Sequence, residues 1–147
     1  MRRLFSLVVP TYNVERYLGD FLESLAAQTY PLDDIEIVFV DDGSSDSSAE
    51  IITKWIAAVA PTARVVHKEN GGLSSARNSG LDRVGSRWVT FSDPDDKLSP
   101  NYFAGVAKFL AKHEREDIHI VACRLLRFDD RTQKLGDTHR LRLRFAK

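Results

Sequence analysis

Three carboxylates and a proline in one run, Asp93-Pro94-Asp95-Asp96, form the pattern best suited to chemistry in this sequence. Carboxylates two positions apart can converge on one cation when the backbone between them turns, and Pro94 favours such a turn. Mg²⁺ and Mn²⁺ prefer oxygen ligands and usually complete their shell with water and substrate phosphate. The pattern therefore indicates a divalent-metal site, and an exposed acidic turn ahead of a helix is the alternative interpretation.

A second acidic pair, Asp41-Asp42, follows an apolar run at residues 35–40. A carboxylate held at the end of a strand can accept an N–H from a nucleobase or a hydroxyl from a ribose. Asp46 and Ser47 are available to cap the helix that follows, so the pair is not needed for that purpose. A solvated Asp-Gly turn is the competing interpretation.

The turn Gly71-Gly72 leads into a predicted helix over residues 74–84. Such a helix start presents free N–H groups to anions. Arg77 falls within an apolar stripe that should face a sheet, and an inward arginine requires an anionic partner. Rim carboxylates, ligand phosphates and a purely structural ion pair all remain open as that partner. The stripe consists of Leu73, Ala76, Arg77, Gly80, Leu81 and Val84.

Alternating strand and helix patterns must position these groups. The predicted strands cover residues 4–9, 35–40, 64–67, 87–91 and 118–121. The predicted helices have apolar faces over residues 14–25, 51–59, 73–84 and 102–110, with a capping box at residues 47–50 and an N-cap and first-turn proline at Ser99-Pro100. Strands that alternate with helices form βαβ units, which gives an α/β fold with a mostly parallel, Rossmann-like sheet and helices on both faces.

One edge of that sheet collects the polar groups. Ligands of open parallel sheets bind at the carboxyl ends of the strands. The first four predicted strands are each followed by turn-forming, carboxylate or amide residues, at 10–15, 41–46, 68–72 and 92–96. The opposite connections, such as 29–31 and 60–62, carry little chemistry. This asymmetry strengthens the metal and nucleotide interpretations together.

Composition limits the other possibilities. The 147 residues fit one main domain, with 43% hydrophobic residues and 21 basic against 21 acidic side chains. The zero net charge gives no reason to expect nucleic acid or an anionic membrane as partner. No apolar run approaches the ~20 residues of a transmembrane helix, and the first residues do not resemble a secretory leader. We expect a cytoplasmic protein, with Cys123 as a core thiol.

The four histidines, His67, His113, His119 and His139, form no cluster, and none is predicted to bind zinc. After residue 125 the pattern becomes charged, with a turn near Asp129 and an alternating run at 140–145. We therefore divide the chain into a domain at residues 1–125 and a tail at 126–147. The absence of an evident closing element suggests that the tail begins an acceptor-side region or is truncated.

Taken in order, these motifs resemble family 2 glycosyltransferases of the A-type (GT-A) fold over roughly residues 4 to 125. The ordered set is specific, although each motif alone is not. The motifs are residues 9–13 (Val-Pro-Thr-Tyr-Asn), residues 40–46 (Val-Asp-Asp-Gly-Ser-Ser-Asp), residues 71–80 around Ala76-Arg77-Asn78, and the Asp-x-Asp run at 93–96.

The resemblance implies inverting transfer from a nucleoside-diphosphate sugar, with a UDP-sugar expected, to an acceptor hydroxyl. It assigns nucleotide-sugar binding to Pro10, Thr11, Tyr12, Glu15, Asp42, Gly71, Arg77 and Asp93, and metal binding to Asp95 with Asp93. Mn²⁺ or Mg²⁺ would neutralise charge on the leaving diphosphate. The setting implied is cell wall or capsule synthesis, with a saccharide or polyol-phosphate acceptor, in the cytoplasm or peripherally at the inner face of the membrane.

Two departures from the family pattern matter. Pro94 stands where the family's Asp-x-Asp usually has a small residue, and together with residues 98–103 and 136–139 it resembles bacterial wall-polymer enzymes with a further glycerophosphotransferase domain. The family's catalytic base lies well after the Asp-x-Asp, and residues 97–147 contain no comparable site. Asp129 and Asp130 fall in a predicted hairpin turn and are poor candidates, so we expect the base outside this chain.

Alternative classes fit less well. A donor-binding module or fragment without transfer activity of its own shares all these motifs, and only an assay separates it from an enzyme. A signalling receiver domain needs its acidic pair after the first strand, where this chain has Pro10-Thr11. A dinucleotide dehydrogenase needs Gly-x-Gly-x-x-Gly at that place, and the sequence lacks it.

Overall fold

The computed structural model describes residues 3–123, 126–129 and 134–138, and the chain divides into two compact units, residues 1–109 and 110–147. The first unit contains β1 (Phe5–Thr11), α1 (Glu15–Ala26), the 3-10 helix η1 (Leu32–Asp34), β2 (Ile35–Asp41), α2 (Ser48–Val59), β3 (Arg64–His67), α3 (Leu73–Leu81) and β4 (Trp88–Phe91). Helix α4 (Tyr102–Lys112) begins in the first unit and ends in the second, which also contains β5 (Leu126–Asp129) and β6 (Lys134–Thr138). The predicted boundary after residue 125 stays a prediction about folding domains.

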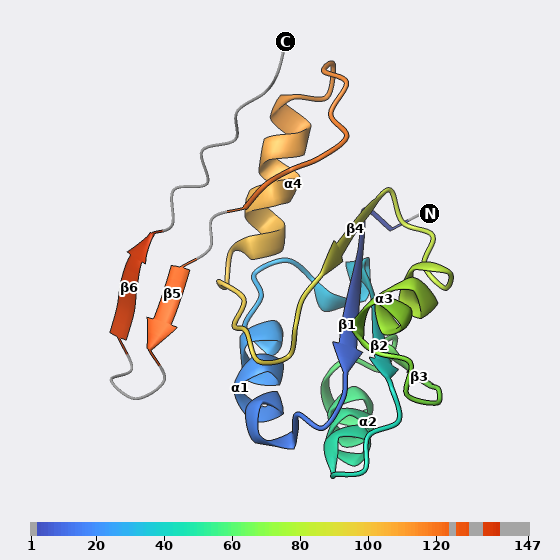
Figure 1. Ribbon diagram of the computed structural model, residues 1–147. Helices are drawn as coiled ribbons and strands as arrows, with labels where there is room; N and C mark the ends of the chain where they lie inside the picture. Colours follow the sequence, from blue (N-terminus) through green and yellow to red (C-terminus); the bar gives the residue numbers. More distant parts are fainter. Residues whose placement is uncertain (1–2, 124–125, 130–133, 139–147) are drawn as a thin grey trace. The chain divides into compact units, whose positions relative to one another are not determined.

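The sheet of the first unit has four parallel strands in the order β3-β2-β1-β4 (Figure 1). Thr11 pairs with Asp41, and Asp41 pairs with His67, so three strands end at the same level. β4 ends slightly earlier, where Phe91 pairs with Val8. The predicted α/β fold with a mostly parallel sheet is confirmed, and its strand ends form one continuous edge.

Helices cover both faces because successive side chains of a strand point to opposite sides. Phe39 of β2 packs edge-on against Trp55 of α2, while the neighbouring Val38 and Val40 pack with Ala76 of α3. Helices α1 and α2 contact each other, on the side of the sheet away from α3 (Figure 1). All seven residues of β1 and all of β2 except Glu36 are buried, as predicted for strands enclosed on both faces.

A glycine sets the distance between α3 and the sheet. A Cβ added to Gly80 would overlap the side chain of Val8 and come within 3.2 Å of Val40. Only a residue without a side chain allows the helix to approach so closely. Helix α3 is thereby held against the two central strands, and its N-terminal end reaches their carboxyl ends.

Several expected details are wrong. Residues 118–121 lie in irregular structure, and Ile120 is 86% exposed, so the predicted fifth strand does not form. Helix α3 ends at Leu81, and both Leu73 and Leu81 are exposed although the apolar stripe predicted them to face the sheet. The fourth strand begins at Trp88, one residue later than predicted.

The capping box predicted at residues 47–50 is also wrong. Ser47 makes no side-chain capping bond, and Glu50 pairs with Lys54 at 2.6 Å. Asp46 accepts the N–H of Ser48 at 3.0 Å and supplies that cap. Of the two residues expected to be available as caps, Asp46 and Ser47, Asp46 is the one that bonds.

In the second unit, β5 and β6 pair antiparallel, as expected for a hairpin. Asp130 of the predicted turn, His139 and the alternating run at 140–145 lie outside the described residues. Among the residues described, no helix has the length and apolar character that a membrane crossing requires.

Candidate nucleotide-sugar site

The carboxyl edge of the sheet is tied together by backbone hydrogen bonds beyond the strands. The N–H of Asp42 donates to the carbonyl of Thr11 at 2.9 Å, and the N–H of Lys68 donates to the carbonyl of Asp41 at 3.0 Å. The segments that follow β1, β2 and β3 therefore leave the sheet in contact with their neighbours. The segment after β4 is held in the same way, because the N–H of Ser92 donates to the carbonyl of Val8 at 3.2 Å.

Asp42 is the most enclosed carboxylate of the site, with 2% of its surface exposed. It accepts hydrogen bonds from Lys68 Nζ, from the N–H of Gly71 at 3.1 Å and from the N–H of Gly72 at 2.8 Å. Burial acts to raise the pKa of Asp42, but these three donors outweigh it and lower that pKa below the ordinary value. Asp42 is consequently an ionised acceptor that anchors the turn before α3.

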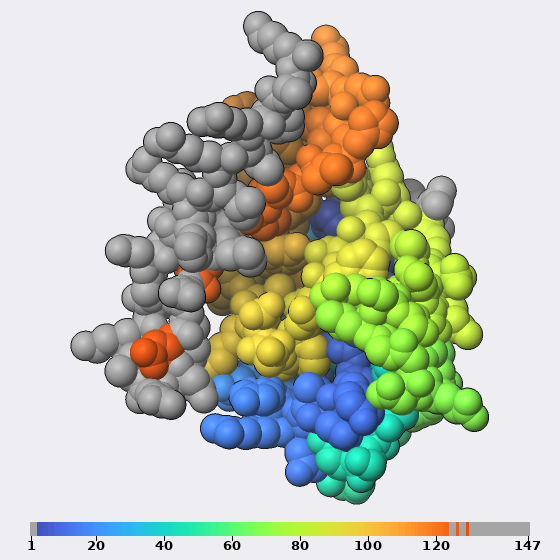
Figure 2. All heavy atoms as spheres, viewed as in Figure 1, coloured from blue at the N-terminus to red at the C-terminus, as the bar shows by residue number. Residues whose placement is uncertain are grey.

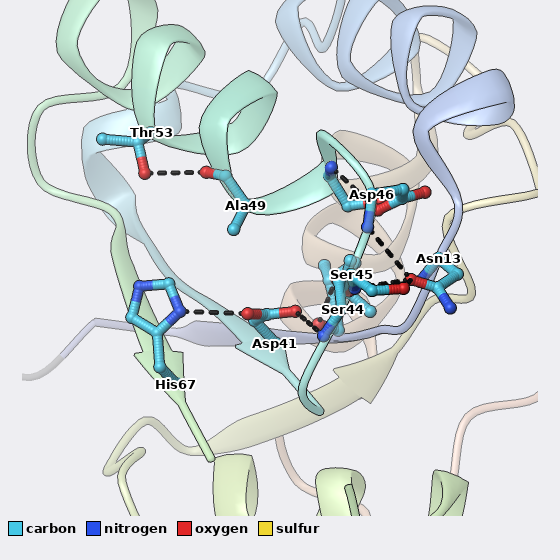
Figure 3. A network of polar contacts seen from close by, with 11 residues as sticks. Asn13, Asp41, Ser44, Ser45, Asp46, Ala49, Thr53 and His67 are labelled. Carbon is cyan, nitrogen blue, oxygen red and sulfur yellow. Dashed lines mark hydrogen bonds and ion pairs between the residues drawn. The ribbon is translucent and has the colours of Figure 1, made fainter. Parts of the chain in front are cut away.

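Asp41 has a different task from its neighbour. One of its oxygens accepts the N–H of Ser44 at 3.0 Å, and the other lies 3.0 Å from Nδ1 of His67 (Figure 3). The acidic pair thus divides its functions, since Asp41 shapes the turn after β2 and Asp42 reaches toward the turn after β3.

The glycine turn was expected to offer free N–H groups to an anion. Instead, the N–H groups of Gly71 and Gly72 both donate to Asp42, so a protein carboxylate is the anion they bind. Gly72 has a φ of 85°, in the left-handed region that favours glycine. The turn is therefore prebuilt around Asp42.

Arg77 finds the anionic partner that its inward position requires. Its Nη2 lies 2.8 Å from one oxygen of Asp93 and 3.0 Å from the other. Its Nε is buried and has no hydrogen-bond partner among the described residues. The pair joins α3 to the segment after β4, and the guanidinium keeps one buried donor that the protein does not use.

The acidic turn, residues 93–96, closes through the N–H of Asp96, which donates to the carbonyl of Asp93 at 3.1 Å. Pro94 is buried, whereas Asp95 and Asp96 are exposed. Desolvation, followed by the charges of Asp95 and Asp93, raises the pKa of Asp96 above its ordinary value. Figure 2 shows the segment after β4 in yellow, open to this face between the blue N-terminal residues and the green α3.

This donor set suits a hard divalent cation. In the described part of the chain, no group of three or more His, Cys, Asp or Glu side chains is arranged to hold a metal by itself. Mg²⁺ is commonly bound by one or two carboxylates together with substrate phosphates, so a complete protein shell is not required. Asp93 and Asp95 fit that partial role, and the mutual repulsion of the turn's carboxylates would be relieved by a cation.

The loops after β1 and β2 cap each other's helices. The N–H of Glu15 donates to Asp46 at 3.1 Å, and the N–H of Val14 donates to Ser48 Oγ at 2.9 Å. In return, Glu15 Oε2 accepts the N–H of Ser47 at 2.9 Å. Glu15, expected at the nucleotide sugar, thus has a structural contact of its own.

The remaining predicted residues end β1. Pro10 and Thr11 are buried within the strand, and Tyr12 immediately after it is 51% exposed. The structure therefore brings Asp42 to Gly71, Arg77 to Asp93, and Thr11 to the backbone of Asp42. It places Tyr12 at the surface of the same edge, where its ring is available to a ligand.

Sequence reasoning missed two residues of this edge. Lys68 was seen only as part of a strand end, although it is the basic residue next to the acidic pair once β2 and β3 are adjacent. Asn13 was seen only as part of a motif, yet its amide oxygen accepts the N–H groups of Ser45 and Asp46. An Asn directly after a strand and before a helix was the signal for a left-handed turn.

Known proteins are similar to this chain in sequence. The Minor teichoic acid biosynthesis protein GgaB of Bacillus subtilis is 43% identical over 129 residues, which cover 87% of this chain and 14% of GgaB. The Poly(ribitol-phosphate) beta-N-acetylglucosaminyltransferase TarS of Staphylococcus aureus is 33% identical over 112 residues, covering 76% of this chain and 20% of TarS. The chain thus spans only a small share of the length of these two relatives.

Solved structures agree. The structure of S. aureus TarS 1–349 in complex with UDP-GlcNAc matches 76% of this chain and 32% of that one, with a TM-score of 0.70 and 34% identity. The mannosyltransferase PcManGT from Pyrobaculum calidifontis, in complex with GDP-Man and Mn²⁺, matches 76% of this chain and 33% of that one, with a TM-score of 0.67 and 29% identity. The A-type fold inferred from the motifs is confirmed. The sequence profile described as "Glycosyl transferase family 2" matches residues 6–146, and the chain belongs to that enzyme family.

Proposed function

We propose that this chain forms the donor-binding part of a glycosyltransferase that transfers a sugar from a nucleoside-diphosphate sugar, with inversion, to an acceptor hydroxyl. The observation that carries the proposal is the ion pair between Arg77 and Asp93, the first residue of the acidic turn. It places a cation with an unused buried donor next to exposed carboxylates, at the sheet edge where α/β proteins bind ligands. The negative diphosphate of a donor would pair with the cation, and its metal ion would pair with the carboxylates.

The nucleotide end of the donor would lie along the ends of β1 and β2. Asp42 is ionised, and a carboxylate offers about four acceptor positions, of which Lys68, Gly71 and Gly72 use three. The fourth can accept an N–H of a base, with Pro10, Thr11 and Tyr12 beside it. Uracil carries such an N–H, and the TarS structure with UDP-GlcNAc supports a UDP-sugar as donor.

The metal, Mn²⁺ or Mg²⁺, would be held by Asp95 and Asp93. The PcManGT structure with Mn²⁺ supports this choice for a related protein. When bound, such an ion neutralises negative charge on the leaving diphosphate. Arg77 would keep Asp93 oriented toward it through the two contacts of Nη2.

The proposed acceptor and the proposed cellular setting rest on the names of the relatives alone. GgaB is named for teichoic acid biosynthesis and TarS for poly(ribitol-phosphate), so a saccharide or polyol-phosphate acceptor in cell wall or capsule synthesis is proposed. We place this work in the cytoplasm or at the inner face of the membrane. The general base that deprotonates the acceptor lies outside this chain in our proposal, because the motifs at the sheet edge all serve the donor.

A thermal-shift screen of nucleoside diphosphates, with and without Mn²⁺, tests donor binding. Ligand at ~100 times its dissociation constant stabilises a protein by about 2.7 kcal/mol, a readily measured shift. We expect the largest shift with UDP and Mn²⁺ together. Equal melting temperatures with and without every nucleotide would refute the proposed function.

The second candidate function is donor binding without transfer by this chain alone. It is favoured because the identified motifs end at residue 96. Incubating the chain with UDP-GlcNAc and an acceptor mixture, beside full-length TarS as reference, tests whether this chain transfers a sugar by itself. Binding without product supports the module, and product formation at a rate near that of TarS shows a complete enzyme.

A further inference from the structure

Asn13 joins the two segments that we call the paired loops, residues 12–14 after β1 and residues 42–47 after β2. Its N–H donates to Ser44 Oγ at 3.1 Å. Its side-chain Oδ1 accepts the N–H of Ser45 at 2.8 Å and that of Asp46 at 3.4 Å, with Ser45 Oγ also at 3.4 Å (Figure 3). One residue of the first loop thus contacts three consecutive residues of the second.

The backbone of Asn13 is equally specific. Among the residues that the structure describes, it is the one non-glycine position with a positive φ, at 49°. Asn tolerates this left-handed conformation better than most residues, because its short side chain bonds locally. Asn13 therefore meets two demands at once, a reversal of the chain into α1 and an amide oxygen aimed at the second loop.

The two residues that flank this joint belong to the nucleotide site proposed above. Tyr12 directly precedes Asn13 and has its side chain exposed, and Asp42 begins the second loop. The carbonyl of Thr11 and the N–H of Asp42 already bond at the strand ends. Asn13 closes the other end of the same pair of segments, so their spacing is set on both sides of Tyr12.

We propose that Asn13 is a positioning residue for nucleotide binding, acting through the loop after β2 and through Tyr12 without contacting the ligand. This inference rests on the proposed function. Loops that are ordered before binding do not have to be ordered by the ligand, which raises affinity. Loss of the amide should therefore weaken binding more than it weakens the fold.

The test compares three variants of the 147-residue chain by calorimetric titration with UDP and Mn²⁺. N13G removes the amide and retains the left-handed backbone, whereas N13A removes the amide and also disfavours that backbone. N101A is the matched control, because Asn101 Oδ1 accepts a bond from Thr29 Oγ1 at 3.1 Å in the connection that leads to α4. We expect N13G and N13A to weaken UDP binding about tenfold and N101A to leave it unchanged.

A spectroscopic readout separates positioning from general destabilisation. In ¹H–¹⁵N spectra, the amide protons of Ser45 and Asp46 should move upfield in N13G as they lose their acceptor. The amides of Gly71 and Gly72, which donate to Asp42, should keep their positions. I52V, a core truncation in α2, should lower the melting temperature without changing UDP affinity.

The outcomes distinguish a failure of the role inferred for Asn13 from a failure of the proposed function. If the parent binds UDP and N13G binds it equally well, the role of Asn13 is refuted and the proposed function stands. If I52V weakens binding as much as N13G does, Asn13 matters only through stability, and the inference is again refuted. If the parent chain binds no nucleotide, the proposed function fails and the inference fails with it.

Discussion

The paired loops and the acidic turn lie at the same edge of the sheet but treat their polar groups in opposite ways. At the paired loops, Asn13, Asp46 and the adjoining Glu15 of α1 each bond to the opposite segment. In the acidic turn, Asp95 and Asp96 are exposed, and desolvation, together with the charges of Asp95 and Asp93, raises the pKa of Asp96.

We interpret this difference as a division of the edge into a part whose polar groups the protein pairs itself and a part that we propose to bind the ligand. Buried or crowded polar groups are normally paired, and those that are not paired call for an explanation. The unused Nε of Arg77 belongs with the acidic turn in that respect. This contrast supports our proposal that the loops after β1, β2 and β3 position the donor, while the turn after β4 binds its charged part.

Helix α3 connects the two regions. Asp42 anchors the turn at its start through Gly71 and Gly72, and Arg77 on its first turns reaches Asp93. Substitutions in either region should therefore be measured first for their effect on the free energy of unfolding, which the paired loops control. Their effect on nucleotide binding is measured second.

The largest effect on stability is expected from Asp42→Ala. It leaves Lys68 and two backbone N–H groups without their acceptor, and breaking a buried ion pair costs about 3 kcal/mol. Asp42→Asn, which retains one acceptor oxygen, should cost about half as much. Urea unfolding near neutral pH measures both, and a loss below about 0.5 kcal/mol in Asp42→Ala would contradict the anchoring role.

The same variant predicts a pH dependence. The pKa of Asp42 is lower in the folded protein than in the unfolded chain, so its ionised form stabilises the fold. That contribution is fully present above the unfolded pKa of about 3.9 and disappears as the pH falls through the folded value. The stability difference between the parent and Asp42→Ala should shrink below about pH 4 and should not change between about pH 5 and 7.

A smaller effect is expected from Gly80→Ala, which tests the connecting helix. The added methyl would meet Val8 and Val40, and overpacking of this kind costs about 2 kcal/mol. Gly19→Ala in α1 is the matched control, because nothing lies within 4 Å of its added Cβ, and it should stabilise by about 0.5–1 kcal/mol. Thermal unfolding that moves in the same direction for both variants would show that α3 is not held as closely as described.

Glu15→Ala should have a smaller effect again. It removes the acceptor of the Ser47 N–H at the start of α2, a capping loss of about 1 kcal/mol. Glu15→Gln keeps an acceptor oxygen and should recover most of that loss. If both variants lose UDP affinity far beyond their loss of stability, Glu15 contacts the donor directly, as its family motif implies.

Much of this edge could be predicted from the sequence because its physics is local. Apolar runs marked β1 and β2, and the parallel topology then placed Asp42, Gly71 and Asp93 at one edge. The requirement of an inward Arg77 for an anion was also sound, since Asp93 meets it. A local sequence pattern does not show which polar groups will hydrogen-bond to each other across the fold. The N–H groups of the glycine turn were therefore expected to be free, although Asp42 accepts them.

The errors share that cause. The capping box at residues 47–50 failed because Asp46 lies closer to the N–H of Ser48, and Glu50 turned to Lys54 instead. Residues 118–121 had the composition of a strand, but composition does not supply a neighbouring strand to pair with. Leu73 and Leu81 fitted the helical period, yet they are exposed, and the residues that α3 buries are Ala76 and Gly80.

The central claim is that the acidic turn binds the metal and diphosphate while contributing little to folding. Asp95→Ala tests it most directly, by calorimetric titration of UDP with and without Mn²⁺. Asp82→Ala, an exposed aspartate at the other end of α3, is the control. We predict that Asp95→Ala unfolds within about 0.5 kcal/mol of the parent and no longer binds UDP more tightly when Mn²⁺ is added. An Mn²⁺-dependent gain in affinity equal to that of the parent and of Asp82→Ala would contradict the claim.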